Sequence, residues 1–457
     1  MTTPTDPTAD TTADSPGGAP TDSAGDPSGF LGELTWRGLI AEQSPGLAAR
    51  LFRGPIAGYI GFDASATSLH VGHLLQVFLL THLQRAGGRP VVVIGGATGM
   101  IGDPSGKSSE RKLLDDAQIA ANAAAIRGQL ERFIDFSPGP TEPLVVDNRE
   151  WLAPYSMLDF LREIGKHFPV PYMLAKDSVQ ARLGAGMSFT EFSYMTLQAA
   201  DFLHLHRDRG VDLQMGGADQ WGNITAGMEL IRRAEGREEG ADPPAFGLCS
   251  PLLLTRSGVK MGKSERGAVF LEPALTSAYE FYQYWIGDED ELAVQHLRWL
   301  TEMRPEDVEA IAAEQAAVPG ARAAQRALAF DLTARVHGPE EAERQVRVAE
   351  AAFSGAPVTD PDVLDVLYRE VAGFELTDEV LAGDMIGLAL ASRLFASKSD
   401  ARRAISQGGL SVGGERVTSA DQAFAEPVAG RYLLVRAGKK RLAVGRQEAS
   451  PEEPRPS

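Results

Sequence analysis

The stretch "GPIAGYIGFDASATSLHVGHLL", residues 54–75, decides the fold. Its first ten residues predict a strand that runs into a polar loop, and apolar residues from Val71 to Leu83 recur at helical spacing over 71–86. A "GG" pair ends this helix at 87–88, and "RPVVVIGG" at 89–96 predicts a buried strand. A strand, a helix and a strand of these lengths indicate a βαβ unit, and parallel sheets of this kind bind ligands at the carboxyl ends of their strands.

Two later segments extend the sheet. "EPLVVDN" at 142–148 and "VDLQMGGADQWGN" at 211–223 are typical of strands that end in polar loops. We therefore expect an α/β protein whose first domain is a Rossmann-like, doubly wound parallel sheet. From about 275 to 350 the chain lacks strand alternation, which predicts an α-helical domain after the sheet.

The composition bounds the class of protein. The chain has 457 residues, 43% of them apolar, which exceeds what one hydrophobic core usually organises, so two or three domains are expected. No run approaches the roughly 18 apolar residues of a spanning helix, and the N-terminus has no signal pattern, so we expect a cytoplasmic protein without a membrane partner. The single cysteine, Cys249, excludes an internal disulfide and a zinc site built from cysteine pairs. Residues 1–30 and 448–457 have the composition of disordered tails.

The charge is distributed unevenly. A formal net charge of −18 argues against uniform binding to nucleic acid. Between Ala391 and Arg446, however, 11 Lys or Arg stand against 4 Asp or Glu. One end of the chain is therefore basic.

Two histidines stand where the first long helix begins. His70 and His73 lie three residues apart, at a helix end that offers backbone N–H groups and a positive dipole, so they are placed to hold phosphate. Gly72 between them permits close approach of a flat base. The alternative interpretation is local: both imidazoles satisfy nearby backbone carbonyls.

Three further stretches carry polar residues. "GGATGMIGDPSGKSS" at 95–109 fits neither standard nucleotide fingerprint, but it leaves Asp103 at the end of a buried strand, where a carboxylate suits an ammonium group. In "TEFSYMTLQAADFL" at 190–203, Tyr194, Gln198 and Asp201 form one helical stripe that needs either a core network or a polar ligand as its partner. "VKMGKSERG" at 259–267 places Lys260 and Lys263 in a turn, either as a solvated loop or as cations that close over a triphosphate.

Together these stretches resemble a known family. "HVGH" before "KMGKS" on a βαβ framework resembles the two signatures of class I aminoacyl-tRNA synthetases, and the surrounding sequence from about 33 to 446 resembles the bacterial tyrosyl-tRNA synthetases. The resemblance implies that the protein activates L-tyrosine with ATP and then transfers tyrosine to the 3′-terminal adenosine of tRNA(Tyr). It also implies a homodimer. The sequence shows no acidic cage for Mg²⁺, so we expect the ion to arrive with ATP and predict no resident metal site.

The resemblance also assigns roles by position. The pair that receives the tyrosine hydroxyl corresponds to Tyr59 and Asp201, the groups around the α-ammonium to Asp103, Tyr194 and Gln198, and the residue near the carboxylate to Gln220. The ATP site corresponds to Gly61, Asp63, Ser65, His70, Gly72, His73, Asp219, Lys260, Lys263 and Ser264. The catalytic set among these is His70, His73, Lys260 and Lys263. The chain departs from the family pattern at Ile60, which replaces a thiol found in some relatives, and at Gly262, which replaces the signature serine.

The basic end resembles a small RNA-binding module that also occurs in a protein of the small ribosomal subunit. In "LASRLFASKSDARRAISQGGLSVGGERV" at 390–417 a helix is expected to present Arg393, Lys398, Arg402 and Arg403, and a hairpin at 439–445 to add Lys439, Lys440 and Arg441. The alternative is a basic face that is merely solvated. The expected domains are a catalytic domain at 31–272, a helical anticodon-side domain at 273–350, a linker at 351–386 and a C-terminal RNA-binding domain at 387–447.

Three other functions stay open. A tryptophanyl enzyme would share the architecture, but an indole does not call for a carboxylate at Asp201 beside Tyr59. A nucleotidylyltransferase would share the histidine motif without explaining the basic end. A catalytically silent RNA-binding relative would explain that end, but it would not require the ligand-facing side chains.

Overall fold

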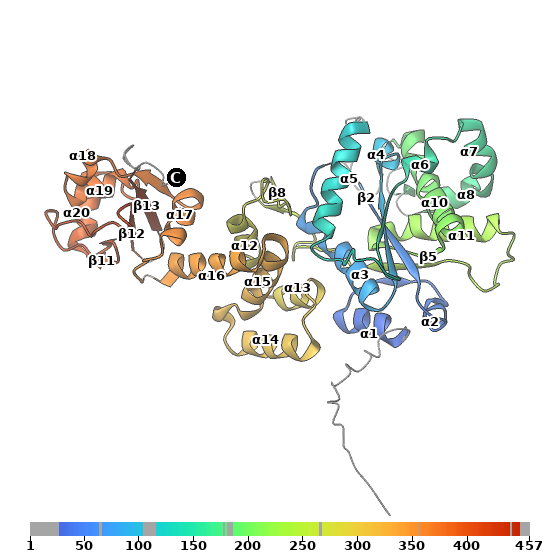
Figure 1. The fold of residues 1–457 in the computed structure, drawn as a ribbon, viewed down its shortest axis with the longest axis horizontal. Helices are drawn as coiled ribbons and strands as arrows, with labels where there is room; N and C mark the ends of the chain where they lie inside the picture. Colours follow the sequence, from blue (N-terminus) through green and yellow to red (C-terminus); the bar gives the residue numbers. More distant parts are fainter. Residues whose placement is uncertain are drawn as a thin grey trace, which may run out of the picture.

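The computed structural model describes residues 27–63, 66–103, 116–176, 179–180, 186–264, 267–354, 356–438 and 441–447 (Figure 1). Of the expected tails at 1–30 and 448–457, residues 1–26 and 448–457 lie outside these ranges. None of the helices within the described ranges is both long and apolar enough to cross a membrane.

The first domain is built on a six-stranded sheet in the order β1-β6-β5-β2-β3-β4. Every neighbouring pair is parallel except β1 and β6, which pair antiparallel. Strand order reverses at β2, so a crevice opens between β2 and β5 at their carboxyl ends. The predicted doubly wound α/β fold is confirmed. The strands are β1 (Glu42–Gln43), β2 (Ala57–Phe62), β3 (Arg89–Ile94), β4 (Leu144–Asp147), β5 (Val211–Gly217) and β6 (Phe246–Ser250).

Helices cover both faces of this sheet, with α3 and α5 on one side and α10 and α11 on the other (Figure 1). Alternation along β2 sends Ile60 and Phe62 into the core beneath α3, and sends Tyr59 into the core beneath α10. The helices of this domain are α1 (Pro27–Arg37), α2 (Leu47–Leu51), α3 (Leu74–Arg85), α4 (Thr98–Ile101), α5 (Asp116–Leu130), α6 (Arg149–Leu152), α7 (Met157–Glu163), α8 (Val170–Leu174), α10 (Phe189–Arg209) and α11 (Trp221–Ala234). Its 3₁₀ turns are η1 (Val71–His73), η2 (Gly165–His167) and η3 (Ala218–Gln220), and β7 (Lys263–Ser264) pairs antiparallel with β8 (Gly267–Ala268).

Three local expectations need adjustment. Helix α1 begins at Pro27, inside the expected tail, because Phe30 is buried in the core with 2% exposure. The helix expected over 71–86 begins as the 3₁₀ turn η1 and becomes α-helical at Leu74. The apolar run "SPLLLT" at 250–255 is strand-like in sequence, but β6 ends at Ser250 and the following residues lead into the lysine loop.

A helical domain follows, as the sequence predicts. It consists of α12 (Ala278–Ile286), α13 (Ala293–Trp299), α14 (Pro305–Ala317), η4 (Pro319–Ala321), α15 (Ala323–His337) and α16 (Pro339–Ser354). Phe281, Trp285 and Leu332 share one apolar cluster with α1 and α3. Arg37 of α1 is buried and donates to the carbonyls of Arg298, Thr301 and Met303 at 2.6, 2.8 and 2.9 Å.

The C-terminal module, residues 361–447, is a five-stranded sheet in the order β11-β10-β12-β13-β9 with helices on both faces. The module begins earlier than expected, since most of the presumed linker 351–386 is folded into it. Apolar residues from Val363 to Leu367 pack α17 onto the sheet, and β9 pairs in parallel with β13. Its elements are α17 (Pro361–Glu370), β9 (Gly373–Glu375), α18 (Asp378–Leu381), α19 (Met385–Ala391), α20 (Lys398–Ser406), β10 (Leu410–Val412), β11 (Glu415–Arg416), β12 (Tyr432–Ala437) and β13 (Arg441–Arg446).

Candidate active site

A cavity of about 750 Å³ opens at the carboxyl ends of β2 and β5. Its walls also include η1, the middle of α10, η3 and the loop that carries Lys260. The predicted site residues that line it are Tyr59, Gly61, Asp63, His70, Gly72, His73, Asp103, Tyr194, Gln198, Asp201, Asp219, Gln220 and Lys260. Ser65 lies outside the described residues, and the side chains of Lys263 and Ser264 lie outside the described part of β7.

The closed end of the cavity holds Tyr59 and Asp201, which are 2% and 3% exposed. Within the described residues, the Tyr59 hydroxyl is buried and has no hydrogen-bond partner. Burial first, and then the nearby Asp201 and Tyr194, raise the pKa of Tyr59 well above its ordinary value, so it stays a neutral O–H donor. A buried donor without a partner costs about 1–3 kcal/mol, which a ligand oxygen would recover.

Two residues that the sequence analysis missed hold Asp201. Asn148 donates to one carboxylate oxygen at 3.0 Å, and the indole N–H of Trp151 donates to the other at 2.8 Å. Burial raises the pKa of Asp201 to about 7, against the opposing effect of these two hydrogen bonds. Asn148 directly follows β4, so its place at the carboxyl end of a strand was a usable signal, whereas Trp151 carried none.

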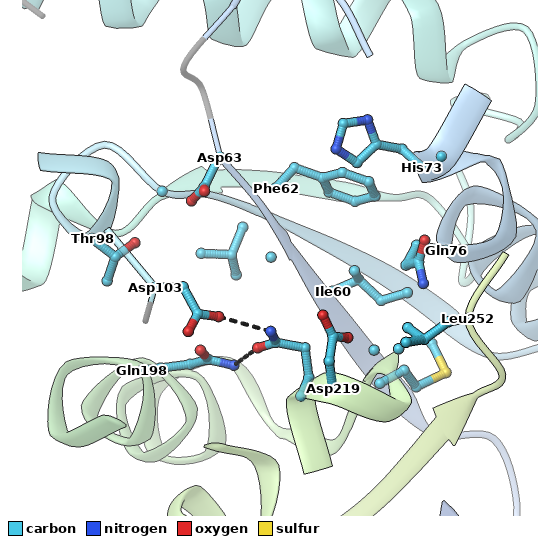
Figure 2. A pocket seen from close by; sticks show the side chains of 18 of the residues that line it. Ile60, Phe62, Asp63, His73, Gln76, Thr98, Asp103, Gln198, Asp219 and Leu252 are labelled. Carbon is cyan, nitrogen blue, oxygen red and sulfur yellow. Dashed lines mark hydrogen bonds between the residues drawn. The ribbon is translucent and has the colours of Figure 1, made fainter. Parts of the chain in front are cut away.

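A polar chain lies beside this pair. Gln220 donates to Asp103 at 2.7 Å, and Gln198 donates to Gln220 at 3.3 Å (Figure 2). Asn223 donates to the same Gln220 oxygen at 3.2 Å. Asp103 does not stand at the end of β3, as expected, but follows α4. A carboxylate and two amides are thus brought together from the loop after α4, from η3 and from α10, and this arrangement can receive an ammonium group beside a carboxylate. Thr98, Gln76 and Gln214 also line the cavity and were not predicted.

The two histidines form one unit at the opposite side of the cavity. The Gly72 N–H donates to Nδ1 of His70, and the His70 N–H donates to Nδ1 of His73, both at 3.1 Å. The rings stack with centroids 3.9 Å apart. Burial, and then His70, lower the pKa of His73 to about 3, so His73 is neutral at pH 7. Because each Nδ1 accepts a backbone proton, the neutral rings carry hydrogen on Nε2 and can act as donors.

Glycine is required at two positions beside these rings. A Cβ at position 72 would lie 2.8 Å from Cε1 of His70 and 2.9 Å from the carbonyl oxygen of Met261. Gly262 has φ +126°, and a Cβ there would lie 3.1 Å from Nδ1 of His70. The departure at Gly262 therefore fits a backbone that favours glycine and approaches the histidine closely.

The lysine loop is tied to the histidine turn through the backbone. Val71 N–H donates to Val269, and Leu271 N–H donates to Leu69, both at 2.9 Å. Lys260 reaches across the cavity mouth and pairs with Asp219 at 2.7 Å. Segments about 190 residues apart in the chain thus meet at one nucleotide-sized space.

The predicted RNA-binding residues lie on the C-terminal module. Lys398, Arg402 and Arg403 are exposed on α20, and Arg403 pairs with Asp400 at 2.7 Å. Arg393 is exposed too, but the expectation that it shares their helix is wrong, since it lies between α19 and α20 with φ +56°. Arg441, at the start of β13, donates to the Leu394 carbonyl. Lys439 and Lys440 lie outside the described residues.

Within the described part of the chain, no group of three or more His, Cys, Asp or Glu side chains is arranged to hold a metal ion. The cavity is lined instead by hydrogen-bond donors, single carboxylates and one lysine amine. This donor set fits an amino acid and a nucleotide.

The family comparisons agree with this site. Residues 52–354 match the model of tRNA synthetases class I (W and Y), and residues 365–444 match the tyrosine–tRNA ligase SYY-like C-terminal domain. The chain therefore belongs to the class I aminoacyl-tRNA synthetases.

The proteins most relevant for comparison indicate to which group of this class the chain belongs. A tyrosine–tRNA ligase of Anaeromyxobacter dehalogenans is 48% identical over 91% of this chain and 98% of the relative. One from Bacteroides thetaiotaomicron is 43% identical over 90% of this chain and 98% of the relative. A C-terminally truncated mitochondrial tyrosyl-tRNA synthetase of Aspergillus nidulans superposes with a TM-score of 0.63 at 28% identity, over 71% of this chain and 94% of that one. Within the class, the chain belongs to the tyrosine–tRNA ligases, which are ligase enzymes.

The partnerless hydroxyl of Tyr59 makes a stability prediction. Tyr59→Phe should leave the ligand-free protein as stable as before or raise its free energy of unfolding by about 1 kcal/mol, because it removes a buried donor that lacks an acceptor. Tyr432→Phe is the matched control: the Tyr432 hydroxyl donates to Asp365 at 2.7 Å, so the same change should cost about 1 kcal/mol. Urea unfolding of both variants measures the difference. A clear loss of stability in Tyr59→Phe would mean that this hydroxyl already has a partner.

Proposed function

We propose that this protein activates L-tyrosine with ATP to tyrosyl-adenylate and pyrophosphate, and then transfers tyrosine to tRNA(Tyr). The observation that carries the proposal is the buried Tyr59 hydroxyl beside Asp201 at the closed end of a cavity whose mouth holds His70, His73 and Lys260. A phenol hydroxyl would accept from Tyr59 and donate to the Asp201 carboxylate. Phenylalanine would leave the buried Tyr59 hydroxyl without an acceptor and would offer Asp201 no proton, and a site built around a substrate hydroxyl rejects an analogue that lacks it.

The polar groups then orient the substrate. Asp103, Tyr194 and Gln198 would surround the α-ammonium, and Gln220 would lie near the carboxylate. Asp219 would receive the ribose hydroxyls of ATP, so its ion pair with Lys260 would open and free this amine for the phosphates. Gly61, Asp63, Ser65, Gly72 and Ser264 complete the proposed ATP site.

In the first step, a carboxylate oxygen of tyrosine forms a bond to the α-phosphorus of ATP while the bond to pyrophosphate breaks. The nucleophile is already ionised, so no general base is required. The rate then depends on positioning and on groups that bind the transition state best, here the Nε2 donors of His70 and His73 and the amines of Lys260 and Lys263. Mg²⁺ would enter bound to ATP as part of the substrate.

In the second step, a hydroxyl of the terminal adenosine of tRNA attacks the tyrosyl carbonyl, and AMP leaves. Lys398, Arg402, Arg403 and the neighbouring cations of the C-terminal module would hold the RNA phosphates. Because this reaction serves translation, we place the protein in the cytoplasm, and cell fractionation checks that assignment.

The tryptophanyl alternative is disfavoured by one contact set. Asp201 is buried, accepts two hydrogen bonds and approaches Tyr59, which together form a receptor for a hydroxyl rather than for an indole N–H alone. A nucleotidylyltransferase or a silent RNA-binding relative would not need this receptor next to a nucleotide site.

Pyrophosphate exchange into ATP tests the proposal. Exchange should depend on tyrosine and should be absent with tryptophan or phenylalanine. His70→Asn should lower the exchange rate about 100-fold while tyrosine affinity stays within about twofold, since His70 would act on the phosphate and not on the amino acid. Exchange that requires tryptophan, or needs no amino acid, would contradict the proposal.

The raised pKa of Asp201 predicts that kcat/KM for tyrosine depends on pH. With its pKa raised to about 7, Asp201 is protonated at lower pH and cannot accept the phenol proton. The kcat/KM for tyrosine should therefore rise about tenfold between about pH 6 and pH 8, because this ratio reports the free enzyme. Asp201→Asn should lower kcat/KM and remove the rise. A flat profile in the unaltered protein would contradict the role of the carboxylate.

We also propose that the protein is a homodimer. Five apolar side chains are exposed on α7, at the start of α8 and at the start of α10: Met157, Leu158, Leu161, Val170 and Phe189. Such a concentration of exposed apolar groups is typical of a protein interface.

Val170→Asp tests the dimer, with Val318→Asp as its matched control, because the two valines are 58% and 56% exposed. A charge inside a dimer interface leaves an unpaired ion in an apolar contact. Sedimentation should show a dimer for the unaltered protein and for Val318→Asp, and a monomer for Val170→Asp. A monomeric unaltered protein would end this proposal.

A further inference from the structure

The junction between α16 and the C-terminal module contains a buried arginine. β12 reads "YLLVRA", and Arg436 is the single charged residue in this apolar strand. It is 3% exposed, and burial lowers its pKa. A buried guanidinium is costly unless its hydrogen bonds are satisfied, so its partners define its role.

Side chains alternate between the two faces of β12, and this alternation places Arg436 on the face that packs against α16. Leu433 and Val435 face the apolar cluster that also contains Ala401 and Ile405 of α20. Tyr432 and Leu434 face the opposite cluster, which includes Val348 and Ala352 of α16 together with α17. Residue 436 continues the second set, since side chains two apart share a face.

The partners of Arg436 lie outside its own module. One guanidinium N–H₂ group donates to the Ala352 carbonyl at 3.1 Å, and the other donates to the Ala351 carbonyl. Both carbonyls belong to the last turn of α16, where helix carbonyls lack intrahelical partners and the dipole is negative. Two parallel bonds from a planar group restrain direction as well as distance.

Further contacts support the same junction. Arg347 of α16 pairs at 3.4 Å with Asp360, which caps the first turn of α17. A Cβ at Gly414, in the turn between β10 and β11, would lie 2.6 Å from Pro357. Figure 1 shows α16 leading from the helical domain to the module.

The sheet separates this junction from the exposed cations. Lys398, Arg402 and Arg403 lie on α20, which packs on the opposite face of β12 from α16. A fixed junction therefore leaves these exposed cations of α20 accessible. It also holds the module in one orientation relative to the cavity.

We propose that Arg436 is a positioning residue, which clamps the end of α16 and thereby sets the orientation in which the C-terminal module presents its cations to RNA. The proposal rests on tRNA being the substrate. An RNA that contacts the module and the cavity together gains affinity only if the two sites are held at a compatible distance.

Arg436→Met tests the clamp, because it removes the two directional bonds to the α16 carbonyls while an apolar side chain fills the space. The KM for tRNA in aminoacylation should rise about tenfold through lost effective concentration, while tyrosine-dependent pyrophosphate exchange stays unchanged.

Spin labels at Glu343→Cys and Ser399→Cys measure the junction directly, since both positions are exposed and the native Cys249 is buried. The distance distribution should be narrow in the parent and broad in Arg436→Met.

Tyr432→Phe is the matched control, because it removes a hydrogen bond from the same face of β12 to Asp365 within the module. It should leave the tRNA KM and the distance distribution unchanged.

Arg436→Lys keeps the charge without the paired geometry. The distance distribution between the spin labels should therefore broaden in this variant too, which tests the clamp even if the methionine variant unfolds. A narrow distribution and an unchanged tRNA KM in both Arg436 variants would overturn the inference. If the unaltered protein charged no tRNA, the proposed function would fail, while the distance measurement would still judge the clamp.

Discussion

The double parallel pairing of β2 is the constraint on which the site depends. β2 pairs with β3 along one edge and with β5 along the other, so the connections leave in opposite directions and the carboxyl ends stay uncovered. Side-chain alternation on this strand then sends Tyr59 toward α10, where Asp201 lies. The histidine turn follows the same strand, and the lysine loop reaches it through backbone hydrogen bonds. The other proposed substrate contacts come from α10, η3 and the lysine loop, which line the same cavity.

The predictable parts of the molecule are those in which one short segment determines its own environment. The strand "RPVVVIGG" and the helix that follows "HVGH" are encoded by the spacing of apolar residues, and the structure has both. His70 and Asp201 could be located because one stands at the start of a helix and the other on a helical stripe, whereas Tyr59, inside β2, was assigned only through the family resemblance. Trp151 could not, since its role depends on a hydrogen bond to Asp201 fifty residues away in the sequence. The Lys260–Asp219 pair is similar, because it exists only after the lysine loop has folded against η1.

The presumed linker shows why composition misleads at domain boundaries. Residues 356–361 contain two prolines and two polar residues, which is typical of a solvated connection, and 356–360 do lie outside any helix or strand. The next residues, however, carry an apolar stripe from Val363 to Leu367, which needs apolar partners from other segments of the chain. It becomes part of a core only through β12 and β13, which lie about seventy residues later. A one-sided amphipathic helix next to a proline-rich turn is thus better interpreted as the first element of the following module.

The buried carboxyl of Asp201 illustrates how selectivity and stability oppose each other in this site. Burial raises its pKa, so the ionised form that a phenol needs is also the form that the folded protein disfavours. Asn148 and Trp151 partly offset that cost, because each donates to one oxygen and favours the charged state. Each carboxylate oxygen can accept more than one hydrogen bond, so these two donors still leave acceptor capacity for a substrate hydroxyl. If either donor were removed, Asp201 would titrate at higher pH and would act as a donor more often. Recognition of the hydroxyl therefore depends on these two residues as much as on the pair that would touch it.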